Sequence, residues 1–402
     1  MNENYVVGID IGSSNVRVLT GELEESGKIK LIGVSSSPVE GMVKGEILDH
    51  GKVNKALEKA LKKAEKMAGV RIKGACVSIS GAGIRSFDSE GALTRHENGG
   101  ISREEAKHVT GSARKVPLPA DRTVIHMMEQ PFVIDEEEGI RDPVGMSGSR
   151  LERTVHIVTS VRKQVDMLRD LLECRGIELV DIMFAPFADA RAIAGSADIQ
   201  PEGMVINIGG EVTSFAWYGN GYLKSSGVLP VGGFNISNDL SIGMSLPFEI
   251  TEQLKKKMCL FDFDSSEEEK TAGREIEIEG RQYRFGIHET DAIAVPRCME
   301  LFKLIGEHAG LNADFRGPVL LSGGGSRLEG IYRVAGDVLN VPVEVVNPSN
   351  IGGLVELAGD PGWITGVGLL FRGRDVMEGY GEGGRINGYF NRILNGLKKV
   401  VC

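Results

Sequence analysis

Two short segments of the chain place an acidic or amide side chain beside a glycine-containing turn. The first is Tyr5–Leu19, in which Asp10 precedes the run Gly12-Ser13-Ser14-Asn15. A second segment, further along the chain, places Asn207 before Gly209-Gly210 in the same way. Backbone N–H groups and hydroxyls at such turns bind anionic oxygens. Two turns of this kind that face each other across a cleft would hold the phosphates of a nucleotide from both sides.

These turns must be carried by β-hairpins. In both segments an apolar run leads into the turn and a second apolar run follows it, which is the pattern of two adjacent strands. A third glycine-rich segment, Ser322–Gly330, follows a short apolar strand at Pro318–Leu321 and precedes the start of a helix. Glycines in such a position let the backbone approach a flat ring closely.

The periodicity of apolar residues predicts the elements around these turns. Strands are expected at 28–34, 74–80 and 153–160, and helices at 52–68 and 161–174. Two polar segments, at about 83–163 and 249–284, interrupt this pattern, one in each half of the chain. The sequence therefore predicts two α/β halves, each with a smaller inserted piece.

Composition and charge exclude several classes of protein. The chain has 402 residues, which exceeds the usual size of one core and predicts two or more domains. Its formal net charge of −10 argues against a general nucleic-acid-binding protein, which would carry a basic surface. The 5 cysteines form no C-x-x-C pair and the 7 histidines are scattered, so we expect reduced thiols and no structural metal. No signal peptide or spanning segment is recognisable, which predicts a cytoplasmic protein.

The C-terminal region differs from the rest of the chain. Several glycines within 372–385 predict a flexible linker. Residues 386–402 then place apolar side chains at helical spacing with basic and amide side chains on the opposite face, a pattern typical of a helix in the plane of a membrane surface. The membrane-binding side chains would be Tyr389, Phe390, Arg392, Ile393, Leu394, Leu397, Lys398 and Lys399. The alternative is a helix that packs on the protein's own core.

Several ordered motifs are typical of one family. They are Gly41-Met42-Val43-Lys44-Gly45, the run Asp142–Leu151, Val155-His156-Ile157-Val158-Thr159, and the run Asn347–Leu354. With the paired turns and the C-terminal pattern, they make nearly the whole chain resemble the actin/Hsp70/sugar-kinase superfamily and, within it, the FtsA family of bacterial cell-division proteins. The resemblance implies an α/β, actin-like (ribonuclease-H-like) duplicated fold. Two lobes would surround a nucleotide cleft, with an FtsA-type inserted subdomain and a C-terminal amphipathic helix.

The resemblance also implies how the chain is divided into subdomains. The expected parts are the first lobe or subdomain 1A (1–83, 164–195 and 360–371), the inserted subdomain 1C (84–163), the second lobe or subdomain 2A (196–232 and 310–359), subdomain 2B (233–309), the linker (372–385) and the membrane-targeting helix (386–402).

A member of this family is expected to bind ATP and polymerise on the cytoplasmic face of the inner membrane at the division site. It would tether filaments of the tubulin-like protein FtsZ, the Z ring, to that membrane. Self-assembly and recruitment of later division proteins would use 84–163, and the C-terminal helix would bind the anionic membrane surface. The C-terminal peptide of FtsZ would bind subdomain 2B, where Arg297 is the expected partner of its acidic groups. The alternative for Arg297 is an ordinary surface arginine.

The resemblance places ATP and Mg²⁺ in the cleft. Gly12, Ser13, Ser14 and Asn15 would hold the β- and γ-phosphates, and Asp10 would reach Mg²⁺ directly or through water. Gly323, Gly324 and Gly325 would face the adenine. Glu252 and Lys255 would contact ribose and base, with an exposed i,i+3 ion pair as an equal alternative. The other candidate nucleotide-binding residues are Asn207, Gly209, Gly210, Thr213, Gly233 and Arg327.

The second turn departs from the family pattern Asp-Ile-Gly-Gly-Gly-Thr-Thr. Asn207 removes a negative charge that would help to hold a metal and an attacking water. Glu211 places a carboxylate where a glycine would face anionic oxygens, unless Glu211 turns outward or binds Mg²⁺ itself. The connection Phe184–Ala188 contains no Glu or Gln that could orient a water. We therefore predict no catalytic residue and weak or absent hydrolysis, with nucleotide acting mainly as a structural clamp.

Two other functions fit the same fold. One is a scaffold of a pilus or secretion assembly of the PilM type, which would bind a peptide of an inner-membrane partner and would not need the tethered C-terminal helix. The other is a small-molecule kinase or phosphatase of the same superfamily, which would require a catalytic carboxylate and a substrate pocket.

Overall fold

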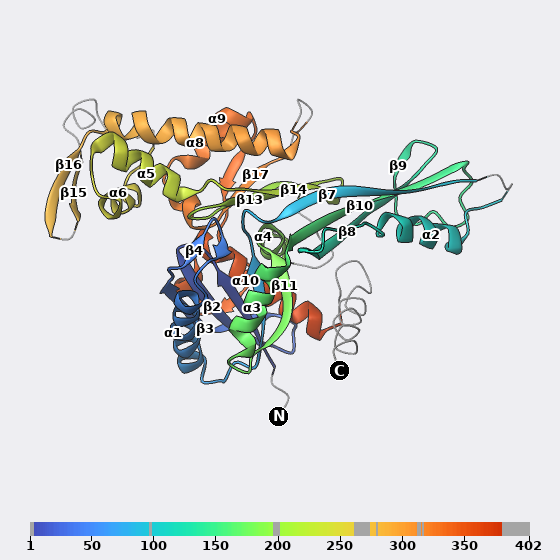
Figure 1. The fold of residues 1–402 in the computed structure, drawn as a ribbon, viewed down its shortest axis with the longest axis horizontal. Helices are drawn as coiled ribbons and strands as arrows, with labels where there is room; N and C mark the ends of the chain where they lie inside the picture. Colours follow the sequence, from blue (N-terminus) through green and yellow to red (C-terminus); the bar gives the residue numbers. More distant parts are fainter. Residues whose placement is uncertain are drawn as a thin grey trace.

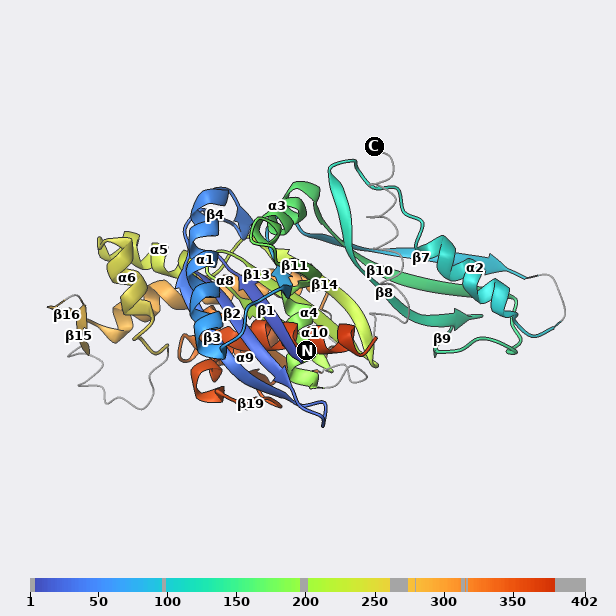
Figure 2. The same cartoon turned by 90° about the horizontal axis from the view of Figure 1, so that it is seen from below.

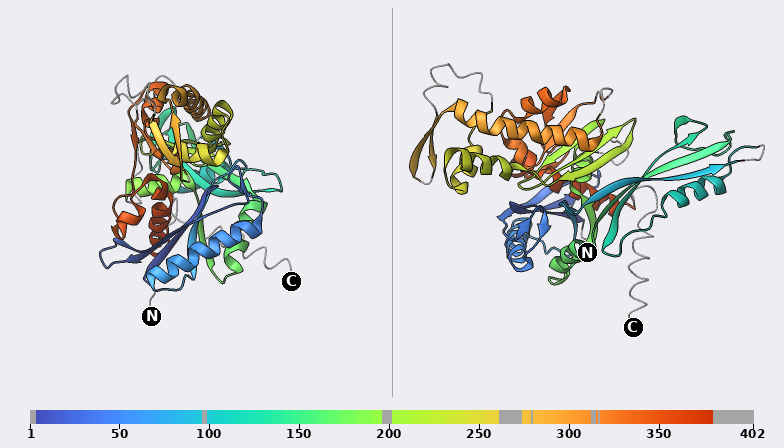
Figure 3. Two further views of the ribbon diagram at one scale, coloured as in Figure 1. Left: turned by 90° about the vertical axis from the view of Figure 1, so that its left-hand side faces the viewer. Right: turned by 45° about the horizontal axis from the view of Figure 1, so that its top comes forward.

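A computed structural model describes residues 4–95, 99–195, 202–260, 274–278, 280–311, 315 and 317–379. The described chain forms two lobes, each built on its own sheet, and an elongated third part that extends away from them (Figures 1 and 2). The elongated part and the hairpin β15–β16 lie at opposite ends of the molecule (Figures 1 and 3).

The first lobe is built on a six-stranded sheet with the order β11-β6-β1-β2-β3-β19. Its strands are β1 (Tyr5–Ile11), β2 (Asn15–Leu23), β3 (Ile29–Pro38), β6 (Gly74–Ile79), β11 (Glu178–Phe184) and β19 (Gly352–Gly353). The first three are antiparallel, whereas β6 runs parallel to β1 and β11 runs parallel to β6. Two short strands, β4 (Met42–Val43) and β5 (Glu46–Ile47), pair with each other.

Helices cover both faces of this sheet, because successive side chains of β1 point to opposite faces and are buried on both. Val7 and Ile9 pack in one core with α1 and α3, whereas Val6 packs with α10 on the other face. Gly8 also faces α10, where a Cβ atom would lie 2.7 Å from the carbonyl oxygen of Gly366. The helices are α1 (His50–Ala68), α3 (Arg162–Glu173), α4 (Ala185–Ala194) and α10 (Ile364–Met377). Close packing at Gly8 holds α10 near the end of β1 that carries Asp10.

The second lobe repeats this plan. Its five-stranded sheet has the order β14-β13-β12-β17-β18, with three antiparallel strands followed by two parallel ones. The strands are β12 (Gly203–Ile208), β13 (Thr213–Gly219), β14 (Tyr222–Leu229), β17 (Val319–Ser322) and β18 (Val343–Val345). Its other elements are α5 (Gly233–Met244), α6 (Phe248–Lys255), β15 (Arg274–Ile278), β16 (Arg281–Phe285), α8 (Ile287–Ala309), η1 (Gly324–Arg327) and α9 (Ile331–Leu339). Two short helical turns, η2 (Val355–Ala358) and η3 (Pro361–Trp363), pack instead with β3 and α10 of the first lobe. Met204 and Ile206 pack with α8 and α9, whereas Val205 joins the core of the first lobe, so the lobes are in direct apolar contact.

The elongated part is a four-stranded antiparallel sheet with the order β7-β10-β8-β9 and with a helix, α2, packed on β7 and β10. Its elements are β7 (Arg85–Thr94), α2 (Arg103–Ala113), β8 (Arg122–Ile134), β9 (Glu137–Ile140) and β10 (Arg150–Val161). His156 fixes its base against β14 of the second lobe. The His156 Nδ1 atom is 2.6 Å from Asp88 Oδ1, and Nε2 is 2.9 Å from Ser226 Oγ.

The predicted helices at 52–68 and 161–174 and the strands at 28–34, 74–80 and 153–160 are confirmed. The predicted linker at 372–385 begins too early. Residues up to Met377 belong to α10, where Arg372 and Asp375 are buried and Arg372 Nε is 2.6 Å from Asp181 Oδ2. The predicted membrane helix at 386–402 lies outside the described residues. Within the described residues, no helix has both the length and the apolar character needed to cross a bilayer.

Candidate functional site

A cleft between the lobes brings together the glycine-containing turns. Its volume is about 370 Å³. The predicted residues that line it are Asp10, Gly12, Ser13, Ser14, Asn15, Asn207, Gly209, Gly210, Gly233, Glu252, Lys255, Gly323, Gly324, Gly325 and Arg327. Segments that are far apart in the sequence therefore meet at one site, as the pairing of the two turns indicated.

The tips of the two hairpins have the same kind of backbone turn, and they face each other. In each tip a glycine N–H, that of Gly12 or of Gly209, donates to the carbonyl three residues further on, at 3.1 Å and 2.9 Å respectively. A Cβ atom on Gly210 would lie 2.6 Å from Ser14 Oγ. The tips are so close at this point that a larger residue in place of Gly210 would displace its neighbours.

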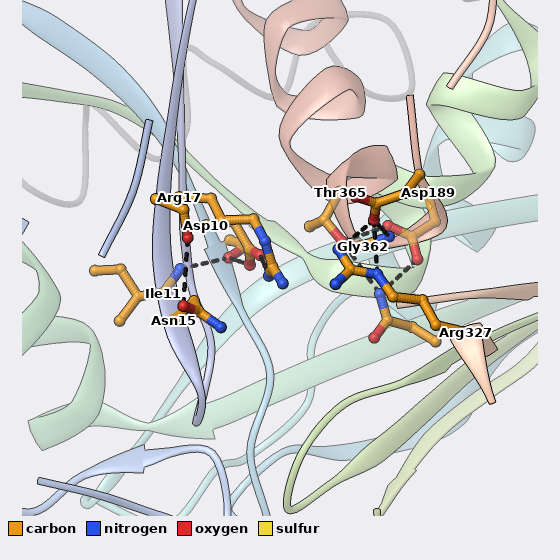
Figure 4. Close-up of polar contacts among 12 residues, drawn as sticks. Asp10, Ile11, Asn15, Arg17, Asp189, Arg327, Gly362 and Thr365 are labelled. Atoms are coloured by element: carbon orange, nitrogen blue, oxygen red, sulfur yellow. Dashed lines mark hydrogen bonds and ion pairs between the residues drawn. The ribbon is translucent and has the colours of Figure 1, made fainter. Parts of the chain in front are cut away.

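The Asp10 carboxylate lines the cleft, and both of its oxygens have partners. The register of the first hairpin places Asp10 directly opposite Arg17. Arg17 Nη1 is 3.2 Å from Asp10 Oδ2, and the Ser78 hydroxyl donates to Asp10 Oδ1 at 2.7 Å. The guanidinium carbon of Arg17 also lies 5.6 Å from the centroid of the Trp363 ring. Arg17 is therefore a fixed cation in the cleft (Figure 4).

A buried carboxylate lies behind the second hairpin. Asp189, on α4, has no exposed surface. Its Oδ2 atom accepts from Asn207 Nδ2 at 2.6 Å and from the Ser322 hydroxyl, and its Oδ1 atom accepts from the Thr365 hydroxyl at 2.7 Å. Burial raises the pKa of Asp189 to about 6, although the three donors oppose this shift. The cluster joins α4, β12, β17 and α10 and so connects the lobes next to the cleft (Figure 4).

The third glycine-rich segment approaches the second hairpin closely. Gly323 has a φ angle of +83°, and a Cβ atom there would lie 2.7 Å from Asn207 Oδ1. Glycine meets both requirements because it adopts the left-handed conformation without strain and has no side chain. The following turn, η1, ends at Arg327, whose Nε donates to Asp360 Oδ1 at 2.8 Å. This backbone forms a wall of the cleft on which a flat ring could lie.

Glu252 and Lys255 form a buried ion pair in the cleft lining. Lys255 Nζ is 2.5 Å from Glu252 Oε2 and donates to the carbonyl of Gly233 at 2.8 Å. The Lys255 and Glu252 side chains are only 9% and 16% exposed. Burial lowers the pKa of Lys255, while the Glu252 charge acts against that shift. The i,i+3 ion pair that was the alternative is therefore present, but it is buried and not exposed.

The structure does not bring Thr213 or Glu211 into the cleft lining. Thr213 is buried at the start of β13, and its hydroxyl donates to the carbonyl of Val231 at 2.8 Å. Its side chain therefore packs into the lobe and does not face a ligand. The Glu211 carboxylate has its Oε2 atom buried without a hydrogen-bond partner among the described residues.

Arg297 lies on α8, outside the cleft lining. Its Nε atom is 2.5 Å from Asp239 Oδ2 on α5, and its Nη2 atom is 3.2 Å from Asp239 Oδ1. Nη1 pairs with Glu300. An acidic ligand would thus have to displace the carboxylates of Asp239 and Glu300 from Arg297.

Comparisons with known proteins decide the family. The family model for the SHS2 domain inserted in FtsA matches residues 81–159, and the model for cell division protein FtsA matches residues 204–368. The cell division protein FtsA of Bacillus subtilis is 32% identical over 376 residues, which cover 92% of this chain and 84% of that protein. The chain belongs to the FtsA family. The FtsA proteins of Pseudomonas aeruginosa and Escherichia coli are each 29% identical, and the matches cover 92% and 93% of this chain and 89% and 91% of the relatives.

Solved structures confirm the fold expected for an FtsA-family chain. The PilM-PilN type IV pilus biogenesis complex aligns with a TM-score of 0.63 and 18% identity, over 92% of this chain and 98% of that chain. MreB5 of Spiroplasma citri bound to AMPPNP aligns with a TM-score of 0.55 and 13% identity, over 94% of this chain and 98% of that chain. These likenesses show the predicted actin-like α/β fold, and the match at 81–159 confirms an FtsA-type insert.

The FtsA resemblance implied a divalent cation that Asp10 would reach directly or through water. Mg²⁺ in proteins is held by carboxylate oxygens together with waters. Here one Asp10 oxygen accepts from Ser78 and the other pairs with Arg17. Among the described residues, no group of three or more His, Cys, Asp or Glu side chains is placed to hold a metal ion. The expected contact between Asp10 and Mg²⁺ stays a prediction, because a carboxylate oxygen that accepts one hydrogen bond keeps a further lone pair for a metal ion or its bound water.

Sequence reasoning missed two charged residues of this site. Arg17 could have been found from the hairpin itself, because a tight turn at Gly12–Asn15 sets the register that places it opposite Asp10. Asp189 directly follows Phe184–Ala188, the connection that contains no Glu or Gln to orient a water. Its contacts come from three other elements, so no local pattern marks it.

Proposed function

We propose that this FtsA-family chain is an ATP-binding division protein that polymerises on the cytoplasmic face of the inner membrane, at the division site, and tethers FtsZ filaments there. The observation that carries this proposal is the cleft in which glycine turns from the two lobes face each other, within a chain of this family. We assign the subdomains as the sequence predicted them, except that α10 extends to Met377 and that β19 and η2 belong to the first lobe, whose sheet and core they join. Subdomain 1C serves self-assembly and the recruitment of later division proteins.

The phosphates of the nucleotide lie between the two hairpin tips in this proposal, and the adenine lies along Gly323–Gly325. Glu252 and Lys255 contact the ribose and base from the opposite wall. The MreB5 neighbour is bound to AMPPNP, which supports a nucleotide as the ligand. No Glu or Gln side chain from Phe184–Ala188 is available to orient a water, so we propose that hydrolysis is weak and that nucleotide acts as a clamp between the lobes.

Equilibrium dialysis with labelled ATP tests the cleft. Gly210→Val places branched carbons where even a Cβ atom would lie 2.6 Å from Ser14 Oγ, so it should weaken ATP binding at least ~10-fold. Gly111→Val is the matched control, because a Cβ atom at Gly111 on α2 would meet no atom within 4 Å. Equal ATP affinity of the Gly210→Val protein and the wild type would contradict binding between the tips.

The second part of the proposal concerns FtsZ. Arg297 and the neighbouring surface of α5, where Ile242 is 72% exposed one turn beyond Asp239, offer a charged group and an apolar side chain to an acidic peptide. FtsZ pull-down on anionic liposomes, with and without ATP, should be lost with Arg297→Glu. The matched control is Arg169→Glu on α3, an arginine of similar exposure that also pairs with an acid, Asp166. Retained pull-down by Arg297→Glu would place the FtsZ site elsewhere.

A further inference from the structure

We propose that a basic groove on the elongated part of the molecule binds the acidic segment 261–273 of a second copy of this chain, so that copies join head to tail. This inference rests on the proposed polymerisation and goes further by naming the two surfaces that meet. The basic groove lies between α2, β8, β10 and the turn that follows β9. Its charged lining residues are Arg103, Lys107, Arg114, Glu129, Arg141, Asp142 and Arg153.

The basic groove carries positive charge that is free to meet a partner. Its volume is about 370 Å³, and its five cations and two carboxylates give it a formal charge of +3, on a chain with a net charge of −10. Arg103 and Lys107 lie one turn apart on α2 and line the groove together with Arg141. All three are exposed, and within the described part of the chain none of them forms an ion pair. A surface with such an excess of one sign attracts a segment of opposite charge.

The floor of the basic groove is already ordered. Arg114 and Arg153 both pair with Glu129, and Arg153 Nη2 is 2.8 Å from Glu129 Oε2. Arg153 also donates through Nη1 to the Thr110 hydroxyl at 3.0 Å, and its guanidinium carbon lies 4.2 Å from the centroid of the Phe132 ring. Arg114 Nε is buried with no hydrogen-bond partner in the described structure. One carboxylate thus serves two guanidinium groups that are held in place, so an incoming carboxylate meets donors that lose little further conformational freedom.

The segment 261–273 has the complementary charge. Five carboxylates and one lysine give it a formal charge of −4, and these residues are Asp262, Asp264, Glu267, Glu268, Glu269 and Lys270. The segment lies outside the described residues, between Leu260 and the start of β15 at Arg274. The C-terminal segment 380–402 also lies outside them, but its four basic residues and one acidic residue give it a formal charge of +3, the same sign as the groove. Like charges repel, so the acidic segment is the part of the chain that suits the groove.

The two charged surfaces belong to opposite ends of the molecule. The acidic segment rejoins the described chain at β15, and the hairpin β15–β16 lies at the end opposite to the elongated part that carries the basic groove (Figures 1 and 3). The contact therefore joins the groove of one copy to the segment of the next. Because it uses two different patches, each added copy leaves one groove and one segment free, and growth continues as a filament.

Reversal of charge on each surface tests the proposal, with the full chain and ATP on anionic lipid monolayers and with filaments scored by electron microscopy. Arg103→Glu/Lys107→Glu/Arg141→Glu reverses the groove, and Glu267→Lys/Glu268→Lys/Glu269→Lys reverses the segment. Each triple variant should raise the protein concentration needed for filaments at least ~10-fold, because several attractive pairs become repulsive. The control Lys55→Glu/Lys59→Glu/Lys63→Glu makes the same change of charge as the groove variant at exposed positions on α1, and should leave that concentration within ~3-fold of the wild type.

A 1:1 mixture of the groove variant and the segment variant separates this contact from a general loss of assembly. The reversed groove of one variant meets the reversed segment of the other, and the two unchanged surfaces also match, so filaments should return within ~3-fold of the wild-type concentration. A mixture that forms no filaments would overturn the inference. So would either variant assembling alone as readily as the wild type, and the groove would then serve an acidic peptide of another protein.

The salt dependence of the wild type needs no variant. Filaments should require more protein as salt is raised from about 50 to about 500 mM, because salt screens exposed charges. Assembly that does not depend on salt would refute the contact even if a triple variant failed to fold. In each of these failures the wild type still polymerises, whereas a wild type that forms no filaments under any of the conditions would contradict the proposed function itself.

Discussion

Asp189 should make the stability of this protein fall as pH rises through the mildly acidic range, and Asp189→Asn should remove that fall. Burial raises the pKa of this carboxyl from 3.8 to about 6. Because its folded-state pKa is the higher one, the folded protein binds the proton more tightly than the unfolded chain. The stabilisation from proton binding is therefore complete below pH ~4 and is lost as pH rises through ~6. A shift of roughly two units at 1.36 kcal/mol each corresponds to ~3 kcal/mol of unfolding free energy.

Urea denaturation of the wild type and of Asp189→Asn at pH 4, 5, 6 and 7 measures this contribution. The difference in unfolding free energy between the two proteins should shift by ~3 kcal/mol in favour of the variant between pH 4 and pH 7. Any fixed cost of replacing the three hydrogen bonds of Asp189 is present at every pH and cancels from this comparison. Asp166→Asn, at a side chain that is 51% exposed, should show no comparable shift. A wild-type-to-variant difference that stays constant from pH 4 to pH 7 would refute the reasoning.

Three further predictions concern the same cleft and the proposed FtsZ site. Asn207→Asp places a second carboxylate at a position 2.6 Å from Asp189 and should lower the unfolding free energy by ~2 kcal/mol. In a urea double-mutant cycle, the double variant Asn207→Asp with Asp189→Asn should recover most of that loss, and additive losses would contradict the coupling. Gly323→Ala should cost ~1–3 kcal/mol in the same assay, because the residue has a φ of +83° and a Cβ atom would lie 2.6 Å from the carbonyl oxygen of Ile208; an unchanged midpoint would refute this. Asp239→Asn frees Arg297 from its two-point ion pair and should tighten the binding of a synthetic FtsZ C-terminal peptide a few-fold. Fluorescence anisotropy measures this affinity, and weaker binding would show that Asp239 itself contacts the peptide.

The parts of the site that could be predicted from the sequence are those encoded locally. A turn such as Gly12–Asn15 between two apolar runs sets both the hairpin and the direction of its N–H groups. Repetition of that pattern at Asn207–Gly210 indicated that two such tips would meet. The glycine run after Pro318–Leu321 was recognisable in the same way. In each case a few adjacent residues carry the structural information, because a glycine or a turn acts on the backbone where it stands.

The parts that could not be predicted depend on contacts between distant segments. Thr213 fits the local pattern of a ligand-binding hydroxyl, yet the strand that it begins directs its side chain into the lobe. The glycines that suggested a linker after Arg372 include Gly373, which lies within α10. A Cβ atom at Gly373 would lie 3.0 Å from Cβ of Val6, so that glycine permits close packing of α10 on β1 and does not make the segment flexible.

The departures from the family pattern form one arrangement of charge when they are placed in the structure. Asn207 in isolation indicates a lost carboxylate, but a carboxylate is present 2.6 Å from its amide nitrogen, on Asp189. That acid is separated from the cleft, so it can hold Asn207 and the two hydroxyls in place without repelling an anionic ligand. Arg17 meanwhile brings a cation into the cleft itself and offsets Asp10. A cleft in which Asp10 is paired with Arg17, and in which Asp189 is withdrawn into the protein, suits the binding of a phosphate chain better than the activation of a water. A structural role for the nucleotide therefore follows from the same residues that disfavour hydrolysis.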